Sequence, residues 1–139
     1  PATLIQLNQR PTGAYTIEYA FTRVSGDGDV VMIVPSSIGL LTVSLGTNSM
    51  QIPELGKHTR GLAEQKIHNL QLGVVYHVVI DVTDSEIVAR VDDQTLEAWS
   101  LDAQEKNIQG KWSRAEAGKL ALGVDGSQVL FSQLLMQLK

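Results

Sequence analysis

The sequence has no cysteine, few aromatic residues and no excess of positive charge. The lack of cysteine excludes disulfides and thiolate-bound metal sites. The net charge is −4 and the 11 basic residues are scattered, so we expect no nucleic-acid partner, because phosphate backbones bind clustered Lys and Arg. No apolar stretch approaches the roughly 18 residues of a membrane-spanning segment, so we expect no membrane span.

The length of 139 residues predicts a single domain covering residues 1–139. A domain of this size buries roughly two thirds of the surface that its unfolded chain exposes, so it needs no covalent cross-link. The chain begins at Pro1 and not at a methionine, and Leu4–Leu7 already has the character of a strand. We therefore expect the domain to be cut from a longer protein.

Period-two alternation of apolar and polar residues is the strongest pattern in the chain, and it is typical of half-buried strands. In 14–23, Tyr15, Ile17, Tyr19 and Phe21 share one face. The ranges with this pattern are 14–23, 75–83, 85–91 and 129–138. The unbroken apolar run 30–34 predicts a central strand buried on both faces, and 39–45 and 118–124 are further strand candidates.

Turn-forming residues separate these ranges, at 25–29, 83–85, 92–94 and 125–127. Many short strands between such turns indicate a sandwich or a barrel. Alternation with one apolar face favours two packed sheets, so the predicted fold is an all-β, two-sheet antiparallel sandwich of the jelly-roll kind. Residues 53–70 predict a long loop with one or two short strands, and the polar stretch 102–117 predicts at most a helical turn at 115–117.

Trp99 and Trp112 are the candidate aromatic platforms for a sugar, because an aromatic ring packs well against the C–H face of a sugar ring. Strict alternation over 95–100 places Trp99 on the polar face of its strand. The alternative is a β-bulge that shifts the phase and returns Trp99 to the core. Trp112 lies in a polar stretch, and its alternative role is to plug one end of the sandwich.

Two arginines, Arg60 and Arg23, are the candidate polar ligand-binding residues, since a guanidinium donates paired hydrogen bonds to hydroxyls or carboxylates. Arg60 lies in the long loop with His58 and His68, whose ten-residue separation does not match a short metal-ligand spacing. The alternative is that all three are solvated loop residues.

A second polar set follows neighbouring predicted strands and could line a binding face; its members are Glu18, His77, Asp81, Glu86 and Arg90. Its alternative role is the solvated side of an antiparallel sheet. The carboxylates of this face could also serve a glycoside-cleaving enzyme, but no spacing selects a catalytic pair. We therefore assign no catalytic residue.

The Gly-rich turn 25–29 carries Asp27 and Asp29, a spacing that calcium loops use. The Glu that such a loop places at its twelfth position is missing, so the alternative is a hairpin turn in which Asp bonds the local backbone. Calcium at this turn is the one candidate metal ion, and we expect no cofactor.

Three stretches together resemble the concanavalin A-like lectin/glucanase sandwich domains, in particular the laminin-G-like and 3-keto-disaccharide-hydrolase-like modules. They are 13–27 (GAYTIEYAFTRVSGD), 91–99 (VDDQTLEAW), and 120–123 (LALG) followed by 129–131 (VLF). Asp93 stands where the second-half hairpin of that family usually has Gly. The resemblance implies a bacterial module that binds a carbohydrate or another protein domain outside the cell or in the cell envelope.

Together these patterns predict a non-catalytic, lectin-like carbohydrate-binding module that uses Trp99, Trp112, Arg60 and Arg23. Two alternatives stay open. One is a glycoside-cleaving sandwich that uses carboxylates of the polar sheet face. The other is an interaction domain of a larger protein, which predicts an exposed apolar patch of several hundred Å².

Overall fold

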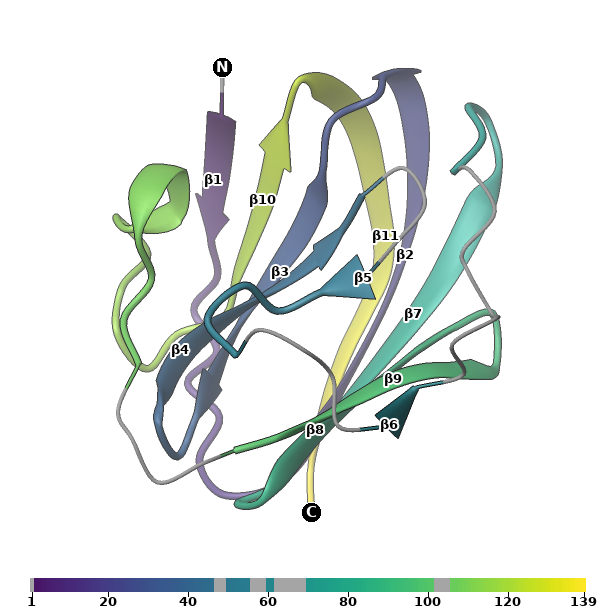
Figure 1. The fold of residues 1–139 in the computed structure, drawn as a ribbon. Coiled ribbons are helices and arrows are strands. Elements are labelled where there is room, and N and C mark those ends of the chain that lie inside the picture. Colours follow the sequence, from purple (N-terminus) through teal and green to yellow (C-terminus); the bar gives the residue numbers. More distant parts are fainter. Residues whose placement is uncertain (1, 47–49, 56–59, 62–69, 102–105) are drawn as a thin grey trace.

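The computed structural model describes residues 2–46, 50–55, 60–61, 70–101 and 106–139, with side chains in all of these except 60–61 and 94–96. The strands form two antiparallel sheets (Figure 1). The five-stranded sheet has the order β1 (Ala2–Gln6), β10 (Ala121–Asp125), β3 (Val30–Ser36), β4 (Gly39–Leu45), β5 (Met50–Gln51). The six-stranded sheet has the order β11 (Ser127–Leu138), β2 (Tyr15–Gly26), β7 (Val75–Val82), β8 (Glu86–Val91), β9 (Gln94–Ser100), β6 (Arg60–Gly61).

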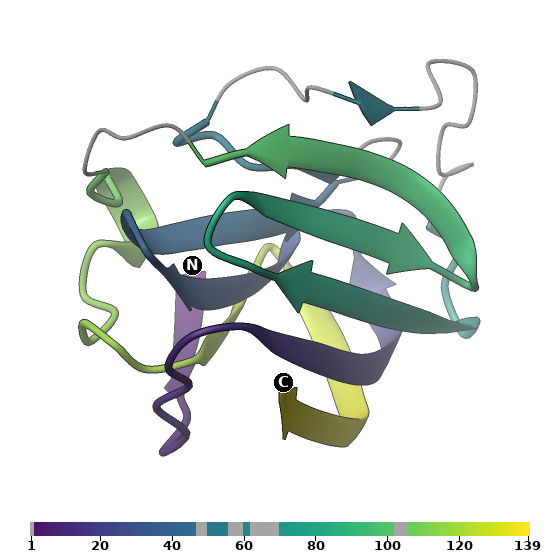
Figure 2. The same ribbon diagram turned by 90° about the horizontal axis from the view of Figure 1, so that it is seen from below.

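The main core lies between the two sheets, which pack face to face (Figure 2). On β2 the alternating residues Tyr15, Ile17, Tyr19 and Phe21 all point into this core, as the alternation predicts. The Tyr15 hydroxyl donates a hydrogen bond to the carbonyl of Pro35 on β3, and so joins the two sheets. Because the same pattern repeats on β7 and β8, the predicted two-sheet sandwich is confirmed.

β3 is buried on both faces, which confirms the prediction from its unbroken apolar run. Val30, Met32 and Val34 belong to the main core, while Val31 and Ile33 belong to a second, smaller apolar cluster on the outer face of the five-stranded sheet. A strand with one side in each cluster has no polar face, and this explains the absence of alternation.

The predicted turns at 83–85 and 92–94 join strands that are paired in the six-stranded sheet. Those at 25–29 and 125–127 instead pass from one sheet to the other, so the hairpin predicted at 25–29 is wrong. Asp92 and Asp93 connect β8 to β9 with φ angles of 51° and 66°, the left-handed values of a type I′ hairpin that Asp tolerates better than most residues. The strand predicted from residue 118 begins later, at Ala121. The helical turn in the described residues is η1 (Gly110–Trp112), earlier than the turn predicted at 115–117.

No helix among the described residues is both long and apolar enough to span a bilayer.

Candidate binding site

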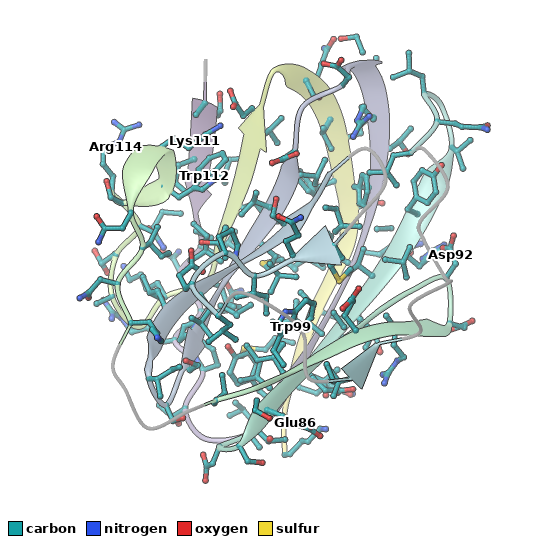
Figure 3. All side chains as sticks on the ribbon, in the orientation of Figure 1. Glu86, Asp92, Trp99, Lys111, Trp112 and Arg114 are labelled. Carbon is teal, nitrogen blue, oxygen red and sulfur yellow. The ribbon has the colours of Figure 1, made fainter. Side chains whose placement is uncertain are left out.

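Trp99 is a core residue, which confirms the bulge alternative and contradicts the strict alternation that places it on the polar face. Along the β8–β9 ladder Ala89 pairs with Glu97, but the next residue, Arg90, pairs with Thr95. This register shift is a bulge of one residue in β9, and it reverses the phase of the strand beyond it. Trp99 therefore lies opposite Ile87, is 1% exposed and points into the space between the sheets (Figure 3).

Arg23 is also an interior residue, with 2% of its surface exposed. Its guanidinium donates hydrogen bonds to the carbonyl oxygens of Gly28 (3.1 Å) and Leu70 (3.4 Å). Arg23 thus ties the β2–β3 turn to the segment before β7. A residue that binds a ligand must be accessible, so the burial of Arg23 contradicts its prediction as a ligand-binding residue. The backbone of Arg60 forms β6 and pairs with Ala98, while its side chain lies outside the described residues, as do His58 and His68.

Trp112 plugs the fold, but over a sheet face and not over one end of the sandwich as predicted. Its ring packs with Val31, Ile33 and Ala121 on the outer face of the five-stranded sheet, and Trp112 is 7% exposed. The ring lies directly over Gly123, where a Cβ atom would stand 2.6 Å from its Cζ3 atom. Glycine at this position of β10 is what lets the ring reach the sheet.

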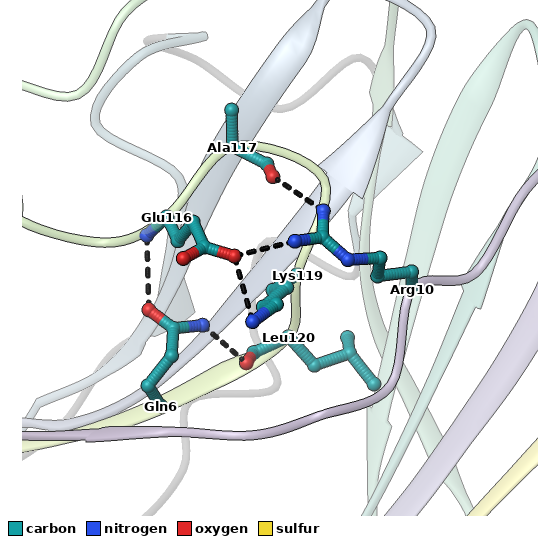
Figure 4. A network of polar contacts seen from close by, with 6 residues as sticks. All are labelled: Gln6, Arg10, Glu116, Ala117, Lys119 and Leu120. Atoms are coloured by element: carbon teal, nitrogen blue, oxygen red, sulfur yellow. Dashed lines mark hydrogen bonds and ion pairs between the residues drawn. The ribbon is translucent and has the colours of Figure 1, made fainter.

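Residues 106–119, which carry Trp112 and are called the covering segment below, lie against this sheet face (Figure 1). A polar network fixes the far end of the segment (Figure 4). The Glu116 carboxylate pairs with Arg10 at 2.6 Å and with Lys119 at 2.7 Å. These contacts lower the pKa of Glu116, and the hydrogen bond from Lys119 has the largest effect. Gln6 accepts a hydrogen bond from the Glu116 N–H and donates one to the Leu120 carbonyl, both at 2.9 Å.

A pocket of about 240 Å³ opens between the covering segment and the start of β4. Its lining combines apolar side chains with one ammonium, one amide and one hydroxyl group: Gly39, Leu40, Lys106, Asn107, Ile108, Trp112, Ser113, Ala115 and Ala117. Gly39 has a φ of 117°, and a Cβ there would lie 2.5 Å from the Lys106 carbonyl oxygen, so only glycine permits this close approach. The Lys106 N–H donates to the Ile38 carbonyl at 2.8 Å and closes the pocket on that side.

Trp112, among the predicted site residues, lines this pocket. Its ring covers Gly123 and lines the cavity, and does not offer a free face to solvent. Leu40, Lys106, Asn107 and Ser113 line the same pocket and were not predicted.

The outer face of the six-stranded sheet carries the predicted polar set. The strand registers place Glu18, His77, Asp81, Glu86 and Arg90 on this side, in the opposite phase to the core residues. The Asp81 carboxylate accepts a hydrogen bond from Thr16 at 2.6 Å and pairs with Arg90 at 3.0 Å and Lys139 at 3.3 Å. Burial acts to raise the pKa of Asp81, but these hydrogen bonds and positive charges outweigh it and lower the pKa.

We expect this network to make stability depend on acid pH. A lowered carboxylate pKa adds stability above the pKa of the unfolded chain, and that contribution is lost as the pH falls through the folded-state value. Asp81→Asn should therefore lower the free energy of unfolding by about 1–2 kcal/mol at neutral pH, the size of charge-assisted hydrogen bonds, and the difference should vanish in strong acid. Urea unfolding from pH 7 down to about pH 2 measures it, with the exposed Glu18→Gln as control. A difference between Asp81→Asn and the natural chain that does not shrink as the pH falls below the ordinary carboxylate pKa contradicts it.

The turn considered for calcium forms the β2–β3 connection, in which Asp29 accepts a hydrogen bond from Ser44 at 3.3 Å. Within the ranges that the structure describes, no three His, Asp or Glu side chains gather closely enough to hold a metal ion. The described residues offer two polar arrangements, a small mixed pocket on one sheet face and a charged network on the other.

Solved structures of low sequence identity share this two-sheet sandwich fold. The carbohydrate-binding module CBM66 from Bacillus subtilis matches with a TM-score of 0.67 and 10% identity, over 98% of this chain and 81% of that one. A putative glycosyl hydrolase from Parabacteroides distasonis matches with a TM-score of 0.61 and 10% identity, over 95% of this chain and 74% of that one. Sheep galectin-11, in complex with glycerol, matches with a TM-score of 0.52 and 12% identity, over 97% of this chain and 96% of that one.

Comparison with protein-family models finds no match, and neither does comparison with the sequences of curated proteins.

Proposed function

We propose that this chain is a non-catalytic carbohydrate-binding module whose ligand occupies the pocket beside Trp112. The observation that carries the proposal is the pocket itself, whose lining joins apolar residues to polar ones on the outer face of the five-stranded sheet. Ligand sites in proteins combine these two features. The similarity of the fold to a carbohydrate-binding module and to a galectin supports the same function.

The lining matches the two sides of a sugar ring. Leu40, Ile108 and the edge of Trp112 offer apolar surface to C–H groups. The Asn107 amide both donates and accepts hydrogen bonds and the Lys106 ammonium donates them, so both suit hydroxyl groups. Ligand pockets commonly measure roughly 300–1,000 Å³, so a cavity of about 240 Å³ suits a single sugar residue at the end of a glycan and not a long chain segment.

The test is a glycan array followed by calorimetry on the glycan that binds. Asn107→Ala removes the amide, and Ala115→Leu fills part of the cavity. Each should weaken binding about tenfold or more, since the loss of one good hydrogen bond or of the space for a ring is worth about 1.4 kcal/mol. Tryptophan fluorescence should change on binding, because Trp112 lines the pocket.

The matched control is His77→Ala, an exposed change on the outer face of the other sheet. It should leave the affinity unchanged. Binding that persists in both pocket variants and is lost in His77→Ala would move the site to the six-stranded sheet and overturn the assignment.

A further inference from the structure

The edge strand β11 is an unprotected surface. It ends the six-stranded sheet, and within the described residues only β2 pairs with it. Its 12 residues, SQVLFSQLLMQL, contain neither a charged residue nor a proline. Four of its leucines are between 39% and 61% exposed: Leu130, Leu134, Leu135 and Leu138.

Exposed strand edges normally carry charges or proline, or are very short, because their free N–H and C=O groups pair with other strands. The other sheet edges in the described residues are shorter: β5 and β6 have two residues each and β1 has five. Of the edge strands in the described residues, β11 alone is long, carries exposed leucines and lacks charge. These features are expected of a strand that pairs with a partner.

The lack of charge also indicates which partner. Two copies of one strand that pair antiparallel about a two-fold axis bring each residue of one copy opposite a residue of the same strand in the other. Any charged side chain near the axis would then face a like charge, which destabilises the pair. A strand without charges has no such penalty, so β11 is suited to pair with itself.

We propose that the protein forms a homodimer in which the β11 strands of two copies pair and join their six-stranded sheets. The partner strand covers the exposed leucines and the rim of the core, where Val129, Phe131 and Met136 of β11 are only partly buried. The contact is isologous, so it closes at two copies and leaves only the two-residue β6 at each end of the joined sheet.

β11 contains one irregularity that limits the pairing. Gln133 has a φ of 56°, and the ladder with β2 shifts between Ser132 and Leu135. A bulge of this kind bends the strand, so the copies pair through the straight parts on one side of it. The pocket beside Trp112 has no lining residue from β11, so the dimer presents two open pockets, and this inference does not depend on the proposed function.

Sedimentation across a micromolar concentration range tests the dimer. The natural chain should show a monomer–dimer equilibrium. Leu130→Lys and Leu135→Lys lie on opposite sides of the bulge, so one of the two places like charges at the paired edge and should weaken association about tenfold or more. Both positions are exposed, so circular dichroism should show that both variants fold. The control is Val75→Lys, a 52%-exposed valine on the same sheet two strands from the edge, which should dimerise like the natural chain.

Because the chain has no cysteine, a spin label on Ser132→Cys reports only from β11, and the dimer should give one short inter-label distance. A chain that stays monomeric at every concentration overturns the proposal, including the case in which β11 pairs with a strand of a different protein. Association that Val75→Lys abolishes while Leu130→Lys and Leu135→Lys retain it also overturns the proposal, because it indicates packing of sheet faces.

Discussion

Replacing Trp99 by alanine should be among the most destabilising single changes in this protein. Trp99 is the largest of the fully buried side chains and packs between the two sheets with the main core. Truncating a buried aromatic residue removes its transfer free energy and leaves a cavity that the rigid sheets cannot close, at a cost of about 3–5 kcal/mol. Because the net stability of a domain is roughly 5–15 kcal/mol, Trp99→Ala should bring the chain close to unfolding.

Urea unfolding followed by circular dichroism measures this loss. Trp99→Phe keeps most of the apolar volume and should lose much less, and Trp112→Ala should lose less than Trp99→Ala because its cluster is smaller and lies outside the main core. Iodide should quench Trp99 fluorescence poorly in the folded chain, measured in Trp112→Phe. A Trp99→Ala variant that unfolds at the same urea concentration as the natural chain contradicts the core assignment.

The strands were predictable because burial on one side of a sheet imposes a period of two. β7 and β8 keep that period throughout, and β2 keeps it from Tyr15 to Arg23 apart from the buried Ala20. Trp99 was not predictable, because one extra residue in β9 reverses the phase of everything after it. A bulge has no fixed composition, so nothing in the sequence of Thr95–Ser100 marks its presence. Only the pairing of β9 with β8 reveals which residue is extra.

The pocket was harder to predict than the fold for a related reason. Its walls come from a strand start and from a covering segment without regular periodicity, so no spacing joins Leu40 to Asn107. The structural role of Arg23 could not be predicted, because its hydrogen-bond partners are backbone carbonyls and no sequence pattern marks them. The covering role of Trp112 could be anticipated, because a large aromatic residue in a polar stretch gains stability by packing on an apolar surface, while its contact with a ligand stays a prediction.

Replacing Gly123 by alanine should lower stability and, if the proposed function holds, weaken sugar binding as well. The added methyl group would stand within 2.6–2.9 Å of three ring atoms of Trp112, so the ring has to leave its place on the sheet. Overpacking of this kind costs about 1–3 kcal/mol. Since Trp112 also lines the pocket, a displaced ring should abolish glycan binding, whereas the core around Trp99 should keep its near-ultraviolet circular dichroism.

A double-mutant cycle separates this ring contact from a general effect on β10. Trp112→Leu removes the ring, so adding Gly123→Ala to it should cost little, and the two losses should fall short of additivity by about 1 kcal/mol or more. Ala121→Gly, on the same face of β10, tests whether any change in that strand loosens the covering segment; it should lower stability and leave the pocket able to bind. Additive losses in the cycle would mean that the Trp112 ring does not lie on Gly123, and the pocket would then have a different wall.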